Sequence, residues 1–184
     1  MFNQSIRFSA NSCYDAIIKL MFSVLMLCLI CPLKFNIQSS IPVTPQSLVI
    51  LIVATWFGWR IGVAAICIYI FSGAIGVPVF AGYDSGVEKL VGPTGGFFIG
   101  FLFSGFVAGI LADKKYFQKP NGNLLLWFIG HFIILLIGAC WFSFYNDEWL
   151  RMIKMIFPGA IIKILIGWFL TLLLFQIVKI KKDR

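Results

Sequence analysis

The sequence predicts an all-α membrane protein with six transmembrane helices, and three observations support this. Of the 184 residues, 60% are hydrophobic and only 12% are charged, whereas a soluble domain is usually about 25% charged. Six apolar runs are separated by short polar or glycine-rich segments. Most lysines and arginines lie between these runs, where membrane topology requires them. We therefore expect a single transmembrane domain over residues 1–184 and, despite the basic charge, no nucleic-acid partner.

Each predicted helix is an apolar run bounded by polar residues, glycine or proline, and a span needs about 20 mainly apolar residues. The predicted helices are residues 14–31, 46–57, 61–77, 95–112, 124–144 and 156–178. The first stops at Pro32 and is expected to be retained, because no small-residue cleavage site follows it. Only Gly58, Trp59 and Arg60 separate the second helix from the third, so these two should form a tight antiparallel hairpin.

The distribution of positive charge predicts the orientation of the chain in the membrane. If the N-terminus is inside, ten of the 15 lysines and arginines lie in inner segments and four lie in outer segments. Because positive residues are retained on the cytoplasmic side, we expect both termini to be cytoplasmic.

The segment from Gly73 to Phe101 is unusually rich in residues that break helices. It contains eight glycines and two prolines, together with polar residues such as Asp84 and Thr94. Irregular backbone at membrane depth is tolerated only where it is buried in protein or lines a cavity. We therefore interpret residues 82–96 as a loop at a ligand site. The phosphate-binding pattern GxxxxGK[ST] is absent, so no ATP hydrolysis is expected from this chain.

Lys163 is the one charged residue inside the apolar run of the sixth predicted helix. It lies seven residues from the expected outer end, a depth of about 10 Å. Gly159 and Gly167 share its helix face, which indicates packing against other helices with room around the amine. We interpret Lys163 as a cation that holds an anion such as a carboxylate. The competing interpretation is that its amine reaches the lipid headgroups.

Several short motifs resemble the BioY family, the biotin-capturing S components of energy-coupling factor transporters. The pair Gly76-Val-Pro-Val-Phe-Ala-Gly82 and Gly92-Pro-Thr-Gly-Gly96 is similar to the family's central loop. Ile41 to Gln46 is similar to the segment after the family's first helix, and Ile137 to Trp141 is similar to part of the fifth. Pro158-Gly159 with Lys163 resembles the family's Pro-Gly-Asp-x-x-Lys motif, although Ala160 stands where the family has aspartate.

The resemblance implies an S-component-like bundle, a multi-pass location in a bacterial inner membrane and biotin as the ligand. It also implies that Lys163 meets the ligand's carboxylate and that the aspartate replaced by Ala160 would accept hydrogen bonds from the ureido ring. Either another acceptor, such as Gln46 or a loop carbonyl, takes that place, or the ligand is a different small carboxylate, for example one like lipoate. The expected ligand-binding residues are Thr44, Gln46, Phe80, Ala81, Gly82, Gly92, Pro93, Thr94, Gly95, Gly96, Trp141, Ala160 and Lys163.

Transport by such a subunit would use a transmembrane coupling protein and two ATP-binding subunits as partners, and no cofactor.

Two other functions compete with transport. One is an intramembrane enzyme that uses Lys163 or His131 as a base, and the other is a structural membrane subunit that binds no ligand. General acid–base chemistry usually needs a positioned partner, and no second titratable group lies within a turn or two of either residue in sequence. We expect His131 to hydrogen-bond a neighbouring helix. Cys28 and Cys31 form a CxxC inside an apolar run, so no metal site is predicted.

Overall fold

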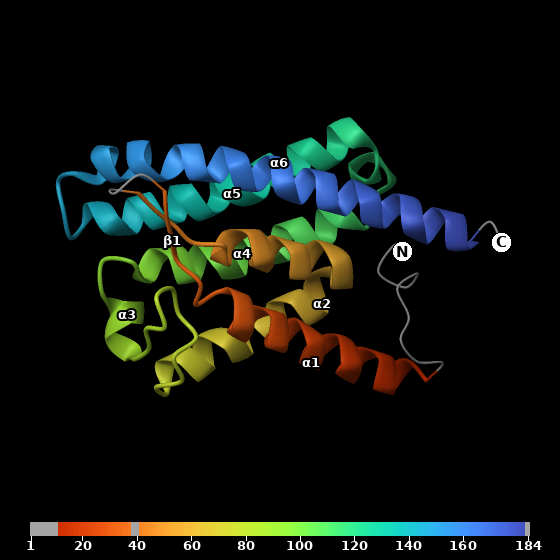
Figure 1. Cartoon of the computed structure of the whole chain (residues 1–184), viewed down its shortest axis with the longest axis horizontal. Helices are drawn as coiled ribbons and strands as arrows, with labels where there is room; N and C mark the ends of the chain where they lie inside the picture. The colour runs from red at the N-terminus through yellow and green to blue at the C-terminus, as the bar shows by residue number, and fades with distance from the viewer. Residues whose placement is uncertain (1–10, 38–40, 183–184) are drawn as a thin grey trace.

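The computed structural model in Figure 1 is a bundle of long helices with a small two-stranded ribbon and a short helix at one end. It describes residues 11–37 and 41–182. The elements are α1 (Ser12–Ile30), β1 (Phe35–Ile37), β2 (Ile41–Val43), α2 (Gln46–Ala74), α3 (Val87–Val91), α4 (Gly95–Ala112), the 3-10 helix η2 (Lys115–Gln118), α5 (Pro120–Ser143) and α6 (Trp149–Lys182). Residues 38–40, and Arg7 and Arg184 of the predicted inner charges, lie outside the described residues.

The all-α class is confirmed, and five helices in the described part of the chain are long and apolar enough to cross a membrane. Helix α4 has the predicted bounds, whereas α6 begins at Trp149, seven residues earlier than predicted. The segment between α1 and α2 contains the ribbon, in which Phe35 pairs with Val43 and Ile37 with Ile41 in antiparallel register.

Helix α2 is one element by its hydrogen bonds but folds back on itself at Gly58. The backbone there has φ 82° and ψ 166°, a region that is open essentially only to glycine. A methyl group added to Gly62 would lie 2.7 Å from the Cα of Ala54, and Gln46 Nε2 lies 2.9 Å from Tyr69 Oη. In a straight helix, residues 23 positions apart would be about 35 Å apart. The two limbs therefore form the antiparallel hairpin that the sequence predicts.

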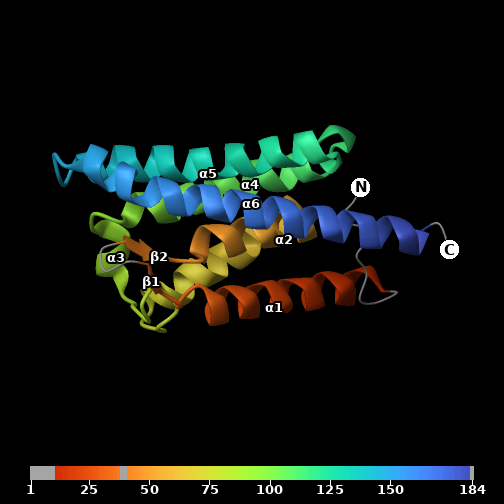
Figure 2. The same cartoon turned by 45° about the horizontal axis from the view of Figure 1, so that its top comes forward.

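The long helices pack in a chain of neighbours, α1 on α2, α2 on α4, α4 on α5 and α5 on α6. Helix α6 closes the arrangement by also contacting α2 and β2. Figure 2 shows the ribbon and α3 together at one end of the bundle, while the first residue of α1 and the last turns of α6 lie at the other. The end that carries the ribbon and α3 is where the candidate site lies.

Large apolar side chains are exposed along the outside of the long helices. Examples are Met21, Leu25, Leu29, Phe103, Phe132, Leu165 and Phe169, each more than one-third exposed. Soluble proteins rarely expose extended apolar surface. This belt is therefore the surface that the hydrocarbon of the bilayer covers.

Small residues allow the helices to approach closely. A methyl group on Gly109 would lie 2.5 Å from the backbone of Trp59, and one on Gly100 would lie 3.1 Å from the Cα of Ile134. Close packing between backbones is a main source of helix association in membranes. Gly100 and Gly109 therefore let the backbones of neighbouring helices pack closely.

The fold-back at Gly58 gives the first prediction. Gly58→Ala should destabilise the protein by ~1–3 kcal/mol, because alanine is strained at this φ and ψ. The measurement is thermal or denaturant unfolding of the purified protein in detergent.

Cys67→Ala is the matched control, because Cys67 is exposed on the second limb of the same hairpin. It should change the unfolding free energy by less than ~0.5 kcal/mol. Equal stability of Gly58→Ala and the wild type would show that the turn does not depend on glycine.

Candidate functional site

A cavity of about 330 Å³ lies between α2, α4, α5 and α6, next to the loop that follows α2. This volume is at the lower end of the range for pockets that bind small molecules. Seven of the residues predicted to bind a ligand line it: Thr44, Gln46, Phe80, Ala81, Thr94, Ala160 and Lys163. Residues far apart in sequence are therefore brought to one cavity.

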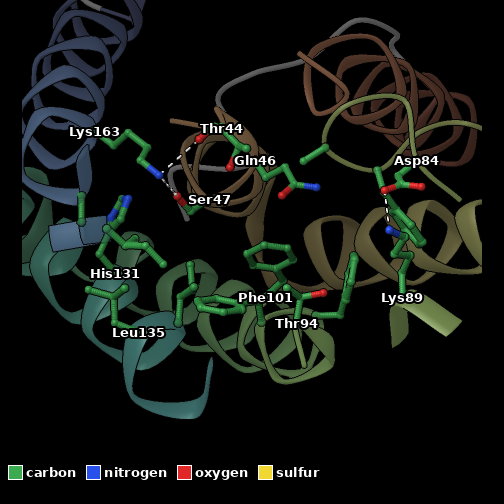
Figure 3. A pocket seen from close by; sticks show the side chains of 17 residues that line it. Thr44, Gln46, Ser47, Asp84, Lys89, Thr94, Phe101, His131, Leu135 and Lys163 are labelled. Carbon is green, nitrogen blue, oxygen red and sulfur yellow. Dashed lines mark hydrogen bonds and ion pairs between the residues drawn. The ribbon is translucent and has the colours of Figure 1, made fainter. Parts of the chain in front are cut away.

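The amine of Lys163 is held inside the cavity rather than directed to lipid. Its Nζ donates hydrogen bonds to the backbone oxygen of Thr44 at 3.2 Å and to Ser47 Oγ at 3.0 Å. Figure 3 shows these two bonds joining α6 to the start of α2. None of the ion pairs in the described part of the chain involves Lys163. The amine therefore retains a donor and an unneutralised positive charge.

The glycines on either side of Lys163 face neighbouring helices, in agreement with the sequence analysis. A methyl group on Gly167 would lie 2.2 Å from the Trp127 ring of α5. Gly159 is buried, and Ala160 is 3% exposed and lines the cavity. This face of α6 therefore lies against the rest of the bundle, and Lys163 is directed inward with it.

A buried polar and aromatic cluster forms the wall beside Gln46. Gln46 Nε2 donates to Tyr69 Oη, and the ring of Tyr69 packs edge-on against Phe80. Phe80 also packs against Phe98, with ring centroids 4.6 Å apart. A methyl group on Gly73 would lie 2.1 Å from the Phe80 ring, so only glycine leaves room for it there. Phe80 is thereby fixed at the cavity wall, as the sequence analysis expected.

Ten lining residues are not among the ligand-binding residues predicted from the sequence: Ser47, Asp84, Lys89, Phe97, Phe98, Phe101, His131, Ile134, Leu135 and Ile156. Most of them follow helical spacing. Phe97 and Phe101 are four residues apart on α4, and His131 and Leu135 are four apart on α5. This spacing was visible in the sequence, but nothing in it indicated which face of an all-apolar helix is directed inward.

His131 is 2% exposed and does not bond a neighbouring helix, which corrects the sequence-based expectation. Its Nδ1 lies 3.1 Å from the backbone oxygen of Trp127, one turn earlier in the same helix. Its Nε2 is buried with no hydrogen-bond partner. The imidazole therefore brings an unused polar atom to a wall of the cavity.

Six residues predicted to bind a ligand do not line the cavity: Gly82, Gly92, Pro93, Gly95, Gly96 and Trp141. The indole nitrogen of Trp141 donates to the backbone oxygen of Gly92 at 2.9 Å, and a methyl group on Gly96 would lie 2.1 Å from Trp141 Cβ. The backbone nitrogen of Gly82 donates to the oxygen of Pro32 at 2.8 Å. These contacts hold the central loop in place, with the loop's glycines against α5 and the end of α1.

An ion pair lies at the end of the cavity away from Lys163 (Figure 3). Lys89 Nζ is 2.5 Å from a carboxylate oxygen of Asp84. This hydrogen bond lowers the pKa of the Asp84 carboxyl below its usual value. The Asp84 carboxylate therefore stays ionised at neutral pH, and Lys89 already has an acidic partner. Among residues 11–37 and 41–182, no group of three or more His, Cys, Asp or Glu side chains could hold a metal ion.

Comparisons with known proteins agree on one family. The family model described as the BioY family matches residues 4–180. The biotin transporter BioY2 of Lactococcus lactis subsp. cremoris is 37% identical over 128 residues, which are 68% of this chain and 69% of that protein. The biotin transporter BioY of Thermotoga maritima is 36% identical over 108 residues, 59% of this chain and 63% of that protein.

A solved structure has the same fold. It is described as the S-component for biotin from an ECF-type ABC transporter, and it superposes with a TM-score of 0.73 at 22% identity. The superposition covers 91% of this chain and 94% of that one. The bundle described above is therefore the S-component fold.

The bond between Trp141 and Gly92 gives the second prediction. Trp141→Phe keeps an aromatic ring over Gly96 but removes the indole donor, so it should destabilise the loop by about 0.5–1.5 kcal/mol. Backbone amides of residues 92–96 should then exchange faster with deuterium. Trp149→Phe is the control, since Trp149 is 37% exposed at the start of α6. Unchanged exchange at 92–96 would show that the loop does not need this bond.

Proposed function

Because the chain belongs to the BioY family, we propose that it is the biotin-binding membrane subunit of a vitamin uptake system. Two of the relatives reported above carry the name biotin transporter, at 37% and 36% identity. The relatives give no support to the alternative of a lipoate-like ligand. The observation that carries the proposal is the cavity itself, which joins one unneutralised lysine to mainly apolar walls.

Lys163 is the proposed partner of the biotin carboxylate. Its amine is positioned by Thr44 and Ser47, and no acidic side chain of the described residues forms an ion pair with it. A charge-assisted hydrogen bond to a carboxylate is stronger than one between neutral groups. The cavity also lies at the N-terminus of α2, where the helix dipole favours negative charge. A carboxylate bound here would be stabilised from both sides.

The apolar part of biotin would occupy the remaining walls. Phe97, Phe98 and Phe101 of α4 line the cavity together with Ile134 and Leu135 of α5. Pockets for small ligands usually combine such apolar walls with a few polar groups that fix the orientation. We propose that ligand binding uses the seven predicted residues that line the cavity, which are Thr44, Gln46, Phe80, Ala81, Thr94, Ala160 and Lys163.

The membrane arrangement is part of the proposal. We infer six crossings with both termini in the cytoplasm of a bacterial cell, α2 supplying two of the crossings through its hairpin. The start of α1 and the segment of η2, which carries Lys115, lie away from the cavity end in Figures 1 and 2, which supports a cavity that opens to the outside. Biotin would enter there, beneath the ribbon and the central loop.

Transport through the membrane would require energising partners. We propose a transmembrane coupling protein and two ATP-binding subunits, by analogy with the transporter class of the structural relative. This chain would then capture the ligand, and the partners would drive its release into the cell.

The role of Lys163 gives the third prediction. Lys163→Ala should weaken biotin binding by ~1.5–3 kcal/mol, or about 10- to 100-fold, and Lys163→Arg should weaken it less. Calorimetry of the purified protein in detergent measures this. Lys154→Ala, an exposed residue of α6 toward its outer end, is the control and should bind as the wild type does.

A comparison of two ligands shows whether Lys163 contacts the carboxylate directly or only supports the structure of the cavity. Biotinamide, which lacks the carboxylate, should bind the wild type more weakly than biotin does, and Lys163→Ala should bind the two about equally. If the wild type bound biotinamide as tightly as biotin, the carboxylate role of Lys163 would be wrong. If it bound neither, the proposed function itself would fail.

A further inference from the structure

His131 is the one cavity-lining side chain of the described residues whose buried polar atom has no partner. Its side chain extends from α5 toward the end of the cavity where Lys163 lies (Figure 3). The residue is 2% exposed, and its Nε2 has no hydrogen-bond partner. A buried polar atom without a partner is destabilising, so such atoms are rare in folded proteins and each calls for a physical explanation.

The hydrogen bond at the other ring nitrogen decides which kind of group Nε2 can bind. Nδ1 lies 3.1 Å from the Trp127 carbonyl oxygen, which can only accept a hydrogen bond. In a neutral imidazole one nitrogen donates and the other accepts. Nδ1 therefore carries the proton, and Nε2 offers a lone pair. The partner that is missing must be a donor.

None of the other polar groups around this end of the cavity donates to Nε2 in the described part of the chain. Ala160 lines the cavity one turn before Lys163 and has no polar side-chain atom. The amine of Lys163 is directed to Thr44, just before α2, and to Ser47 on α2 rather than to α5 (Figure 3). A molecule that enters the cavity is therefore the source of the missing donor that we consider.

We propose that Nε2 of His131 accepts a hydrogen bond from an N–H group of the ligand and selects ligands that carry one. The proposal rests on the proposed function, in which the ligand is biotin and the N–H belongs to its ureido ring. The carboxylate of biotin cannot serve instead, because an ionised carboxylate only accepts hydrogen bonds. Lys163 and His131 thus recognise opposite kinds of group: Lys163 donates to the ligand's acceptor, and His131 accepts from its donor.

Gln46 is the competing acceptor in the same cavity. Its Nε2 donates to Tyr69 Oη, which leaves its amide oxygen free to accept. This oxygen is not among the fully enclosed atoms that lack a partner, so water can satisfy it in the empty protein, whereas Nε2 of His131 is enclosed without a partner. The observations therefore favour His131, and a Gln46→Leu variant tests the alternative directly.

The test compares biotin with a thiolane-valerate, the carboxylate that keeps the thiolane ring and side chain of biotin but lacks the ureido group. Affinities are measured by calorimetry for the wild type, His131→Phe and Gln46→Leu in detergent. His131→Phe should weaken biotin binding about tenfold or more, ~1.4 kcal/mol, and leave thiolane-valerate binding unchanged. Ile134→Val, an apolar lining residue on the same helix, is the control and should affect both ligands alike.

The thermal stability of the ligand-free protein shows whether His131 acts as an acceptor for the ligand or is needed for folding. His131→Phe removes an unpaired buried acceptor, so the ligand-free variant should unfold at the same temperature as the wild type or higher. The variant Ala160→Asp places a carboxylate acceptor in the same cavity. It should therefore restore biotin affinity in the His131→Phe background, which gives a second readout if the truncated ligand binds too weakly to measure.

Three results would overturn the proposal. The first is unchanged biotin affinity of His131→Phe, and the second is an equal loss of affinity for both ligands. The third is a selective loss in Gln46→Leu but not in His131→Phe, which would assign the acceptor to Gln46. If the wild type bound no biotin at all, the proposed function would fail and this inference with it.

Discussion

An ammonium group inside an apolar helix must be given hydrogen-bond acceptors by the rest of the protein. Lys163 obtains them from Thr44 and Ser47, more than one hundred residues earlier in the chain. A charge at membrane depth without such partners costs at least ~2.5–3.5 kcal/mol. The requirement therefore ties α6 to the start of α2, and the cavity forms at the junction. Gln46 and Ala160, which both line the cavity, lie on the two helices that this junction joins.

The central loop is held by contacts that compensate for its irregular backbone. Trp141 bonds the oxygen of Gly92, Tyr145 bonds the oxygen of Val91, and Gly82 bonds Pro32. Backbone groups at membrane depth have no water to satisfy them, so each contact replaces one that a helix would have supplied. The glycines of this segment act in packing rather than as lining residues. A glycine-rich loop beside a binding site can thus be necessary without touching the ligand.

Local signals in the sequence predicted much of the fold. Gly58, Trp59 and Arg60 between two apolar runs predicted the hairpin, and Pro93 with the glycines around it predicted where α4 begins. The early start of α6 was missed because Arg151 and Lys154 interrupt the apolar pattern there, although both lie on the helix. His131 and the phenylalanines of α4 were missed for another reason. In a membrane bundle the lipid is as apolar as the core, so periodicity does not show which face of a helix is directed inward.

The fold-back at Gly58 also sets how far a captured molecule still has to travel. The first limb of α2, from Gln46 to Phe57, rises only about 18 Å, whereas the hydrocarbon core is ~30 Å thick. In the proposed orientation, the cavity and not helix would occupy the upper part of the bilayer at this point. A ligand seated on Gln46 and Ser47 would then have passed about the first third of the hydrophobic barrier without leaving the outer side. The remaining path would be the length of one short helix limb.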